Sequence, residues 1–490
     1  DAIARRNELQ EGNVGGWVSV ADIYRFANEL QQAYVNAGYP LARIIVPAQT
    51  LGADGVVRIQ VVDGFVESLD LDGVPAAARN RVRSVMQPLV GVHRPTRQML
   101  ERRLLIAGDT AGLTLRTTMT PGGALGATVL VLSGDHHAVF GTVSADNRVA
   151  DEYGRGQVAA SLAFNSPFGA GEQIYGTIAG YPEDSMLQDD ATRRYFAAGA
   201  SVPIGNNGLA AHVALDYSST RPSGDVANLK LESEYAREGV GLSFPIIRSR
   251  RGNVVAHADF DVVSETQNTS LTGTSQPLSA DRLRVIRLGL DASGEMHHNT
   301  RAAAGFEFSQ GLDAFGARSA SEATAIKPLS RFGADAEFSK LTAQASAQYQ
   351  FENGAVFSAA IDGQISFGAP LLRSEQYSPI SPTGLSGPPP SAMVGDAGQT
   401  VRFELQAPSW GSANSFAAPY LFGASSEVRL EEPSALELEH TRAHEIGVGV
   451  RLGVRNGGQA LAASVEYSLM ESNDQTLDRN WVSASVSYRF

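Results

Sequence analysis

The sequence predicts an all-β transmembrane barrel that is preceded by two small α/β modules. Two observations predict it: long stretches in which apolar and polar residues alternate, and a shorter N-terminal part with mixed helix and strand patterns. The expected parts are residues 1–64, residues 65–137 and residues 138–490. The charge divides in the same place, because residues 1–137 balance acidic and basic side chains and the rest carries the net charge of −13.

The alternation is clearest near the C-terminus. In residues 446–454 five aliphatic side chains fall on one parity, and three glycines and an arginine fall on the other. Residues 461–469 repeat the pattern, and residues 482–490 end on it with Tyr488 and Phe490 on the apolar parity. A period of two gives each strand one apolar and one polar face.

Two architectures use such strands. In a soluble sandwich the apolar face meets a second sheet, whereas in a transmembrane barrel it meets lipid and the polar face lines a lumen. Three features favour the barrel: the polar connection at residues 471–480, the Ser-, Gly-, Gln-, Arg- and Glu-rich polar faces, and aromatic residues near strand ends, where an interfacial girdle belongs. These aromatic residues are Tyr467, Trp481, Tyr488 and Phe490.

The N-terminal part begins with a well-marked helix. Residues 19–38 show apolar side chains at helical spacing, with Ser19 as N-cap, Asp22 three residues later and Gly38 as a stop. Strands are expected to follow at residues 42–49 and 56–62, joined by the turn at Asp54-Gly55.

A similar order then recurs. The second module is expected to contain a strand at 66–73, helices at 76–87 and 96–108, and strands at 113–119 and 127–133. The repeat unit is therefore strand–helix–helix–strand–strand, and the first copy lacks its opening strand. Such modules have exposed sheet edges, which can pair with an extended peptide.

Composition and motifs exclude several functions. No stretch approaches the roughly 20 apolar residues of a membrane-spanning helix, and the net charge argues against a nucleic-acid partner. Cysteine is absent, and residues 1–10 show no signal peptide and resemble the interior of a mature protein. The sequence contains no G-x-S-x-G, P-loop or H-E-x-x-H motif, so no enzyme, cofactor or metal site is expected. The pairs His136-His137 and His297-His298 are interpreted as solvated loop residues.

Several segments, taken in order, resemble the two-partner secretion transporters of the Gram-negative outer membrane, the TpsB or ShlB/FhaC/HecB type. These segments are residues 34–49, 54–73, 164–173, 242–253, 281–291, 330–341 and 370–378. The resemblance implies two periplasmic POTRA domains, the first incomplete, followed by a barrel of about sixteen antiparallel strands in the outer membrane.

The resemblance also implies a function. Such a pore would capture an unfolded secreted or surface protein on its POTRA edge strands and translocate it to the cell surface. Outer-membrane lipid, lipopolysaccharide and the barrel-assembly machinery would be further partners, with Tyr488 and Phe490 of the closing strand as the assembly signal. The alternative is a non-secreting barrel that acts as scaffold or receptor for an envelope protein; an outer-membrane hydrolase is disfavoured because no catalytic motif is present.

In this family a long loop enters the barrel with an Arg-Gly-Phe/Tyr tip, followed by a Gly-Asp-Ser-Gly-like segment. Residues 374–398 align with that loop. Ser386, Gly387 and Pro388 stand at the tip motif, while Gly395, Asp396 and Gly398 keep the second segment. Three consecutive prolines from Pro388 onward are expected to stiffen the tip toward polyproline II.

The family's arginine meets an aspartate of the barrel wall in a Phe-x-Asp-x-Gly strand. Here Phe422 is kept, but Ala424 replaces the aspartate and Ser426 the glycine. Losing both charges together is physically sensible, since one charge left alone in a partly dry lumen would be unfavourable. The resemblance therefore implies that the ion pair which organises the family's pore is absent.

Overall fold

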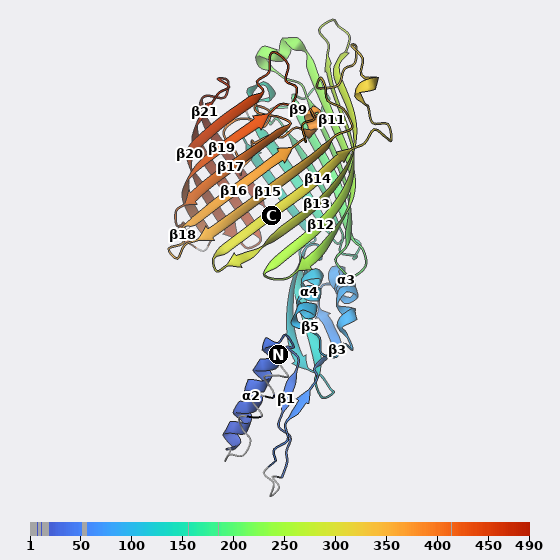
Figure 1. Cartoon of the computed structure of the whole chain (residues 1–490), viewed down its shortest axis with the longest axis vertical. Helices are drawn as coiled ribbons and strands as arrows, with labels where there is room; N and C mark the ends of the chain where they lie inside the picture. Colours follow the sequence, from blue (N-terminus) through green and yellow to red (C-terminus); the bar gives the residue numbers. More distant parts are fainter. Residues whose placement is uncertain are drawn as a thin grey trace.

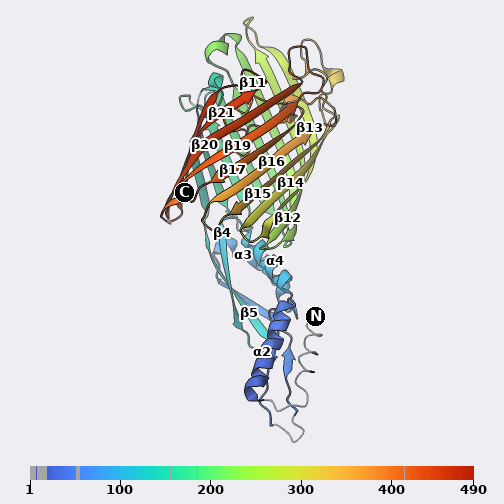
Figure 2. The same ribbon diagram turned by 60° about the vertical axis from the view of Figure 1, so that its left-hand side comes forward.

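The computed structural model of the chain describes residues 7, 11, 19–50, 56–154, 156–184, 186–412 and 414–490. A large closed barrel forms one end of the molecule, and the N-terminal helices and strands extend from one part of its rim (Figures 1 and 2). No helix within these residues is long and apolar enough to cross a membrane.

The first module contains helix α2 (Val20–Asn36) and the antiparallel strands β1 (Arg43–Ile45) and β2 (Gln60–Val62). Ser19 caps the helix as predicted, because its hydroxyl accepts the Asp22 N–H at 3.1 Å and the Asp22 carboxylate accepts the Ser19 N–H at 3.1 Å. The Asp54-Gly55 turn is outside the described residues, and so is most of the segment before Ser19 that bears on the opening strand.

Strands β1 and β2 are shorter than the sequence predicts, for a local reason. Pro47 has no N–H to continue the ladder beyond β1. The side chain of Gln49 instead bonds both backbone groups of Arg58, accepting its N–H at 2.8 Å and donating to its carbonyl at 2.8 Å. A side chain thus replaces the last rung of the predicted hairpin.

The second module follows the predicted order closely. Its elements are β3 (Phe65–Gly73), α3 (Ala76–Met86), the 3₁₀ turn η1 (Gln87–Leu89), α4 (Arg97–Gly108), β4 (Leu113–Pro121) and β5 (Ala127–His136). The sheet order is β3-β5-β4, with β3 parallel and β4 antiparallel to β5. Helices and sheet enclose one apolar core, centred on residues such as Val82, Met86 and Leu130.

The barrel strands are all antiparallel to their neighbours. They are β6 (Val139–Asp146), β7 (Gln157–Asn165), β8 (Gln173–Gly180), β9 (Arg193–Pro203), β10 (Ala210–Thr220), β11 (Leu231–Arg248), β12 (Gly252–Thr269), β13 (Gln276–His297), β14 (Thr300–Gly311), β15 (Ser339–Gln350), β16 (Val356–Ile365), β17 (Ala397–Gln406), β18 (Trp410–Ser412), β19 (Ser415–Arg429), β20 (His440–Asn456), β21 (Gln459–Ser472) and β22 (Asn480–Arg489). Short 3₁₀ turns lie in the connections: η2 (Asp151–Tyr153), η3 (Gly224–Leu229), η4 (Ala320–Glu322) and η5 (Arg373–Glu375).

Strand β18 pairs with β19 directly after β17 does, so β17 and β18 act as one interrupted strand and the described barrel has sixteen. The last strand closes the sheet onto the first, with Ser485 opposite Asp146 and Arg489 opposite Thr142. The predicted architecture is thereby confirmed.

The two parities of each strand face opposite environments, as the alternation predicts. On β20, Ile446 and Val448 are more than half exposed on the outer wall, whereas Glu445 is buried on the inner one. On β21, Leu469 is exposed and Ser468 is buried. A closed sheet with an apolar exterior and a polar interior is the arrangement of a transmembrane barrel.

The glycines of β20 leave room for aromatic rings of β19. Gly447 lies opposite Phe422 and Gly449 opposite Tyr420 in the register. A Cβ on Gly447 would come within 2.6 Å of the Phe422 ring, and one on Gly449 within 2.4 Å of the Tyr420 ring. The glycines on the inner face of β20 therefore allow aromatic rings of β19 to pack directly on the backbone.

Arginines of the second module hold the barrel rim. Arg103 of α4 donates to the Asn206 carbonyl at 2.7 Å and Arg102 to the Pro245 carbonyl at 2.7 Å. Arg81 of α3 donates to the carbonyl of Gly205. Because these carbonyls belong to β11 and the β9–β10 turn, the module is fixed beneath this part of the rim.

Candidate functional site in the barrel lumen

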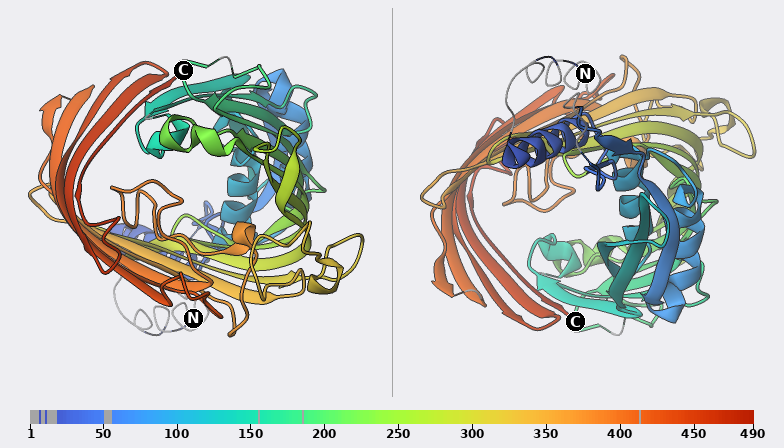
Figure 3. Two further views of the ribbon diagram at one scale, coloured as in Figure 1. Left: turned by 90° about the horizontal axis from the view of Figure 1, so that it is seen from above. Right: turned by 90° about the horizontal axis from the view of Figure 1, so that it is seen from below.

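The connection between β16 and β17, residues 366–396, folds into the barrel; it is called the lumen loop below. Viewed from above, this orange segment runs inside the ring of strands (Figure 3). The predicted loop, residues 374–398, falls on it, except that strand β17 already begins at Ala397 and includes Gly398.

Asp396 holds the base of the lumen loop. Its carboxylate is fully buried and accepts N–H groups from Leu371 at 2.9 Å and Glu431 at 2.6 Å. It also forms an ion pair with Arg331, whose guanidinium reaches the Glu431 carbonyl as well. One carboxylate therefore joins the lumen loop to the β14–β15 connection, which carries Arg331, and to the β19–β20 connection, which carries Glu431.

Glu375 fixes the lumen loop to strands β13 and β15 of the wall. It is buried and pairs with Arg287 of β13 at 2.7 Å and with Lys340 of β15 at 2.8 Å. Arg287 also binds Asp261 of β12 at 2.7 Å, so neither acid is left as an unpaired buried charge.

The tip of the loop is held by a set of polar residues that we call the tip lock: Ser386, Arg402, Glu445 and Ser483. The Ser386 N–H donates to the Glu445 carboxylate at 2.8 Å, and the Ser386 hydroxyl accepts from Arg402 at 3.1 Å. The Ser386 carbonyl accepts from the Ser483 hydroxyl at 3.0 Å. Arg402 also donates to the Gly384 carbonyl at 3.1 Å, so the wall forms hydrogen bonds to two residues of the tip, Gly384 and Ser386.

The barrel register explains how these groups meet. Ala424 of β19 lies directly opposite Arg402 of β17 on one side and opposite Glu445 of β20 on the other. The two charges therefore flank the position from which the wall aspartate is missing. Phe422, one inward position from Ala424, carries the Arg402 guanidinium on its ring at 3.7 Å.

The tip is thus anchored although the family's ion pair is absent. The wall supplies a cation and an anion, and a neutral serine of the loop bridges them. An apolar cluster supports the same region, in which Leu385 of the tip packs with Ala424 and with Leu477, the single apolar residue of the polar β21–β22 connection.

The remaining predicted loop residues are packing positions. A Cβ on Gly387 would meet the Trp481 ring at 2.7 Å, one on Gly395 the Arg429 carbonyl at 2.8 Å, and one on Gly398 the Tyr377 ring at 2.5 Å. Pro388 is buried, and a turn closed by the Ala392 N–H to the Pro389 carbonyl at 3.0 Å follows it directly.

Trp481 is one residue that the sequence places wrongly. Its position near a strand end predicts an interfacial girdle, but the side chain lies on the inner wall against Gly387, with the Arg479 guanidinium over its ring at 3.9 Å. The parity of β22 accounts for this, because the outward positions of that strand are Val482, Val486 and Tyr488.

Charged residues continue along the wall below the tip. Arg402 lies 3.5 Å from both Glu404 and Glu466, and Glu466 accepts the Tyr420 hydroxyl at 2.5 Å. Arg451 pairs with Glu404 at 2.9 Å. This part of the lumen wall is therefore a polar network in which Glu404 and Glu466 each have a cation or hydroxyl partner.

The predicted assembly residues lie at the seam of the barrel. The backbone of Phe490 exchanges two hydrogen bonds with Gly141 of β6, at 2.9 and 3.0 Å, and a Cβ on Gly141 would come within 2.3 Å of the Phe490 ring. Tyr488 stacks on Phe490 at 5.9 Å. Both aromatic residues therefore cover the junction between the first and last strands; their role as a recognition signal stays a prediction.

No group of histidine and acidic side chains in the described part of the chain is arranged to hold a metal ion. His297 and His298 contact each other edge to face, with ring centroids 5.4 Å apart.

A sixteen-stranded barrel, a loop seated in its lumen and α/β modules under the rim define an outer-membrane transporter of the POTRA–barrel class. The family model for the haemolysin secretion/activation protein ShlB/FhaC/HecB matches residues 126–433, and that for the ShlB-type POTRA domain matches residues 4–64. The chain belongs to this two-partner secretion family. It is accordingly an outer-membrane protein whose N-terminal domains are periplasmic.

Individual relatives agree with this assignment. The outer membrane transporter CdiB of Dickeya dadantii is 23% identical over 82% of this chain and 69% of the relative. The heme/hemopexin transporter protein HuxB of Haemophilus influenzae is 24% identical, and that match spans 57% of this chain and about half of the relative (48%).

Solved structures share the fold. CdiB from Escherichia coli superposes with a TM-score of 0.77 at 18% identity, over 99% of this chain and 88% of that one. BamA from Haemophilus ducreyi, lacking POTRA domains 1–3, gives 0.56 at 11% identity, over 100% of this chain and 98% of that one.

Sequence reasoning missed the wall residues of the tip lock. Arg402, Glu445 and Ser483 lie on three different strands, and their proximity depends on the strand register. One signal was present, since each is a polar residue at an inward parity of its strand. Parity alone does not select them from the many other inward polar residues.

Proposed function

We propose that this protein translocates an unfolded partner protein from the periplasm to the cell surface, with the lumen loop as the plug that must be displaced. The observation that carries the proposal is that a few hydrogen bonds to polar side chains of the lumen wall seat the loop tip, beside the apolar cluster around Leu385. Contacts of this kind can be exchanged for water one at a time, so the tip can leave the wall without unfolding the barrel.

The periplasmic modules supply the capture surface. Strand β4 pairs with β5 on one side, and within the described residues its other edge is free. Its residues from Thr118 to Thr120 are exposed. An extended segment of the partner would add to this edge by backbone hydrogen bonds.

Photo-crosslinking tests this step in cells that carry the full chain. A photoreactive residue in place of Met119, which is exposed on β4, is expected to trap the partner during export. The matched control replaces Leu125, which is also exposed but lies in the β4–β5 turn. Equal trapping at both positions would contradict edge pairing.

The alternative role as a scaffold or receptor gives a different result in the same cells. Deleting the transporter should leave the partner in the periplasm if the chain is a pore. If the partner still reaches the surface of the deletion strain, and copurifies in fixed proportion with the barrel from cells that carry the full chain, the scaffold role holds and the proposal fails.

A further inference from the structure

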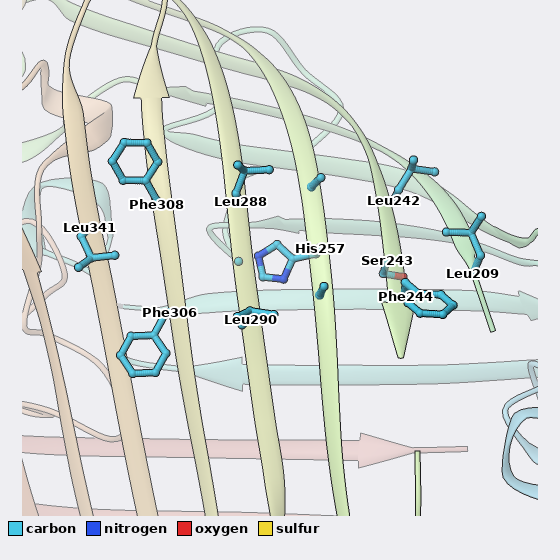
Figure 4. Close-up of a pocket in the computed structure, with 13 residues that line it drawn as sticks. Leu209, Leu242, Ser243, Phe244, His257, Leu288, Leu290, Phe306, Phe308 and Leu341 are labelled. Carbon is cyan, nitrogen blue, oxygen red and sulfur yellow. The ribbon is translucent and has the colours of Figure 1, made fainter. Parts of the chain in front are cut away.

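A groove runs along β12 on the outer wall of the barrel. Its floor consists of Ala256 and Ala258, which lie between Phe244 and Leu242 of β11 and Leu290 and Leu288 of β13 in the strand register. Figure 4 shows these larger side chains on both sides of β12. The groove has a volume of about 520 Å³ and an apolar lining.

The groove continues toward the periplasmic rim. A second hollow, of about 810 Å³, adjoins it one step along the same strands, with Val254, Ala292 and Met296 in its lining. Arg251, in the turn between β11 and β12, lines the mouth of this hollow. Glu295, whose N–H donates to the Arg251 carbonyl at 2.8 Å, also lines it. The groove and the hollow together, called the apolar channel below, therefore end at charged side chains.

That turn carries a second arginine. Arg250 and Arg251 are both exposed, and among the described residues neither guanidinium forms a hydrogen bond or an ion pair. Their neighbour Arg248, by contrast, is paired with Asp109 of the second module at 2.5 Å. Two guanidinium groups without an ion pair thus stand at the rim next to the apolar hollow, with the carboxylate residues Glu295 and Glu101 beside the same turn.

The dimensions suit one leaflet of a membrane. From Arg251 to Ala258 the strand advances about 24 Å at roughly 3.4 Å per residue. With the tilt of about 45° that is usual for such barrels, this corresponds to about 17 Å of depth, close to half of a hydrocarbon core of about 30 Å. The charged end faces the periplasm, because the modules attach at the same rim.

We propose that this channel binds an anionic phospholipid of the periplasmic leaflet. Arg250 and Arg251 bind the phosphate and the headgroup charge, and an acyl chain lies on Ala256 and Ala258 between the flanking leucines and Phe244. The lipid is bound at the turn that also holds the second module, since the Arg250 N–H donates to Glu101 of α4 at 2.6 Å. The site rests on the outer-membrane location and is independent of the translocation proposal.

The test uses the full chain in nanodiscs of phosphatidylethanolamine with a minor fraction of phosphatidylglycerol that carries a photoreactive acyl chain. Crosslinks are expected to concentrate on peptides of β12 and β13. Replacing both Arg250→Gln and Arg251→Gln should reduce the crosslink yield there several-fold. The matched control is Arg455→Gln, an exposed arginine at the periplasmic end of β20, which should leave the yield unchanged.

A second variant tests the groove itself. Ala256→Leu with Ala258→Leu fills the floor and should lower the yield while the arginines remain. Each variant is first shown to fold by its heat-modifiable mobility on gels. Crosslinks spread evenly around the barrel, or equal yields from a photoreactive phosphatidylethanolamine, would mean bulk lipid contact only and would overturn the proposal.

Discussion

Removing the cation of the tip lock should open the pore. In Arg402→Met, the tip loses two charge-assisted hydrogen bonds, to the Gly384 carbonyl and the Ser386 hydroxyl, both 3.1 Å long. Each such bond contributes about 1.5–3 kcal/mol. The lower value for both gives about 3 kcal/mol, which is a change of roughly 150-fold in the ratio of seated to unseated loop at about 1.4 kcal/mol per tenfold.

The barrel itself should tolerate this change. After the substitution Glu404 keeps its ion pair with Arg451, and Glu466 keeps the Tyr420 hydroxyl and Arg148. These two carboxylates therefore keep partners, and Glu445 keeps the Ser386 N–H while the tip is seated, so the folded fraction on gels is expected to match the unmodified protein.

Single-channel conductance of the full chain in planar lipid bilayers measures the effect. Arg402→Met should spend a far larger fraction of time in the open state. The control Arg451→Met removes another lumen arginine, whose side-chain bonds go to Glu404 and Gln406 rather than to the loop. If both variants open the pore equally, the tip lock is not what seats the loop.

Moving the arginine from the barrel wall to the loop gives a more specific test. Ser386→Arg alone places a second guanidinium beside Arg402 and should open the pore. Combining it with Arg402→Ser returns the arginine to the loop, where Glu445 and Glu466 remain as acceptors, and should restore closure. A double variant that stays as open as Arg402→Met would refute the reasoning.

Three further outcomes follow from the contacts. Asp396→Asn removes the ion-pair partner of Arg331 and should destabilise the packing at the base of the lumen loop by about 3–5 kcal/mol. Protease cleavage in the β14–β15 connection should become faster, and unchanged cleavage would contradict this. Gly141→Ala should lower the heat-modifiable fraction because the new methyl meets the Phe490 ring, whereas Gly176→Ala, with its nearest contact at 3.7 Å, should not. Hydrogen bonds from Ser19 lower the pKa of the Asp22 carboxyl, so its contribution to helix α2 is present above the usual carboxyl pKa and is lost as the pH falls through the lowered one. Hydrogen exchange of α2, corrected for intrinsic rates, should show this loss, and its persistence in Asp22→Asn would argue against it.

The sequence by itself determined the architecture. Period-two alternation determines that each strand has an apolar and a polar face. A closed barrel places the apolar face against lipid and the polar face against the lumen, and it leaves no unpaired strand edge in the membrane. Local signals were sufficient for the second module and for helix α2, where Ser19 and Asp22 form the expected capping box. These features depend on residues close in the chain, so they are visible without a structure.

The tertiary structure decided what holds the lumen loop. The absence of the arginine at Ser386 and of the aspartate at Ala424 suggested that the lock was lost, but cross-strand register places Arg402 and Glu445 on either side of Ala424. The pairing of β22 in the barrel also places Trp481, which the parity of that strand turns inward, against Gly387. Both outcomes arise from pairings between strands distant in sequence, and a shift of one residue in any pairing would have moved these side chains to the opposite face.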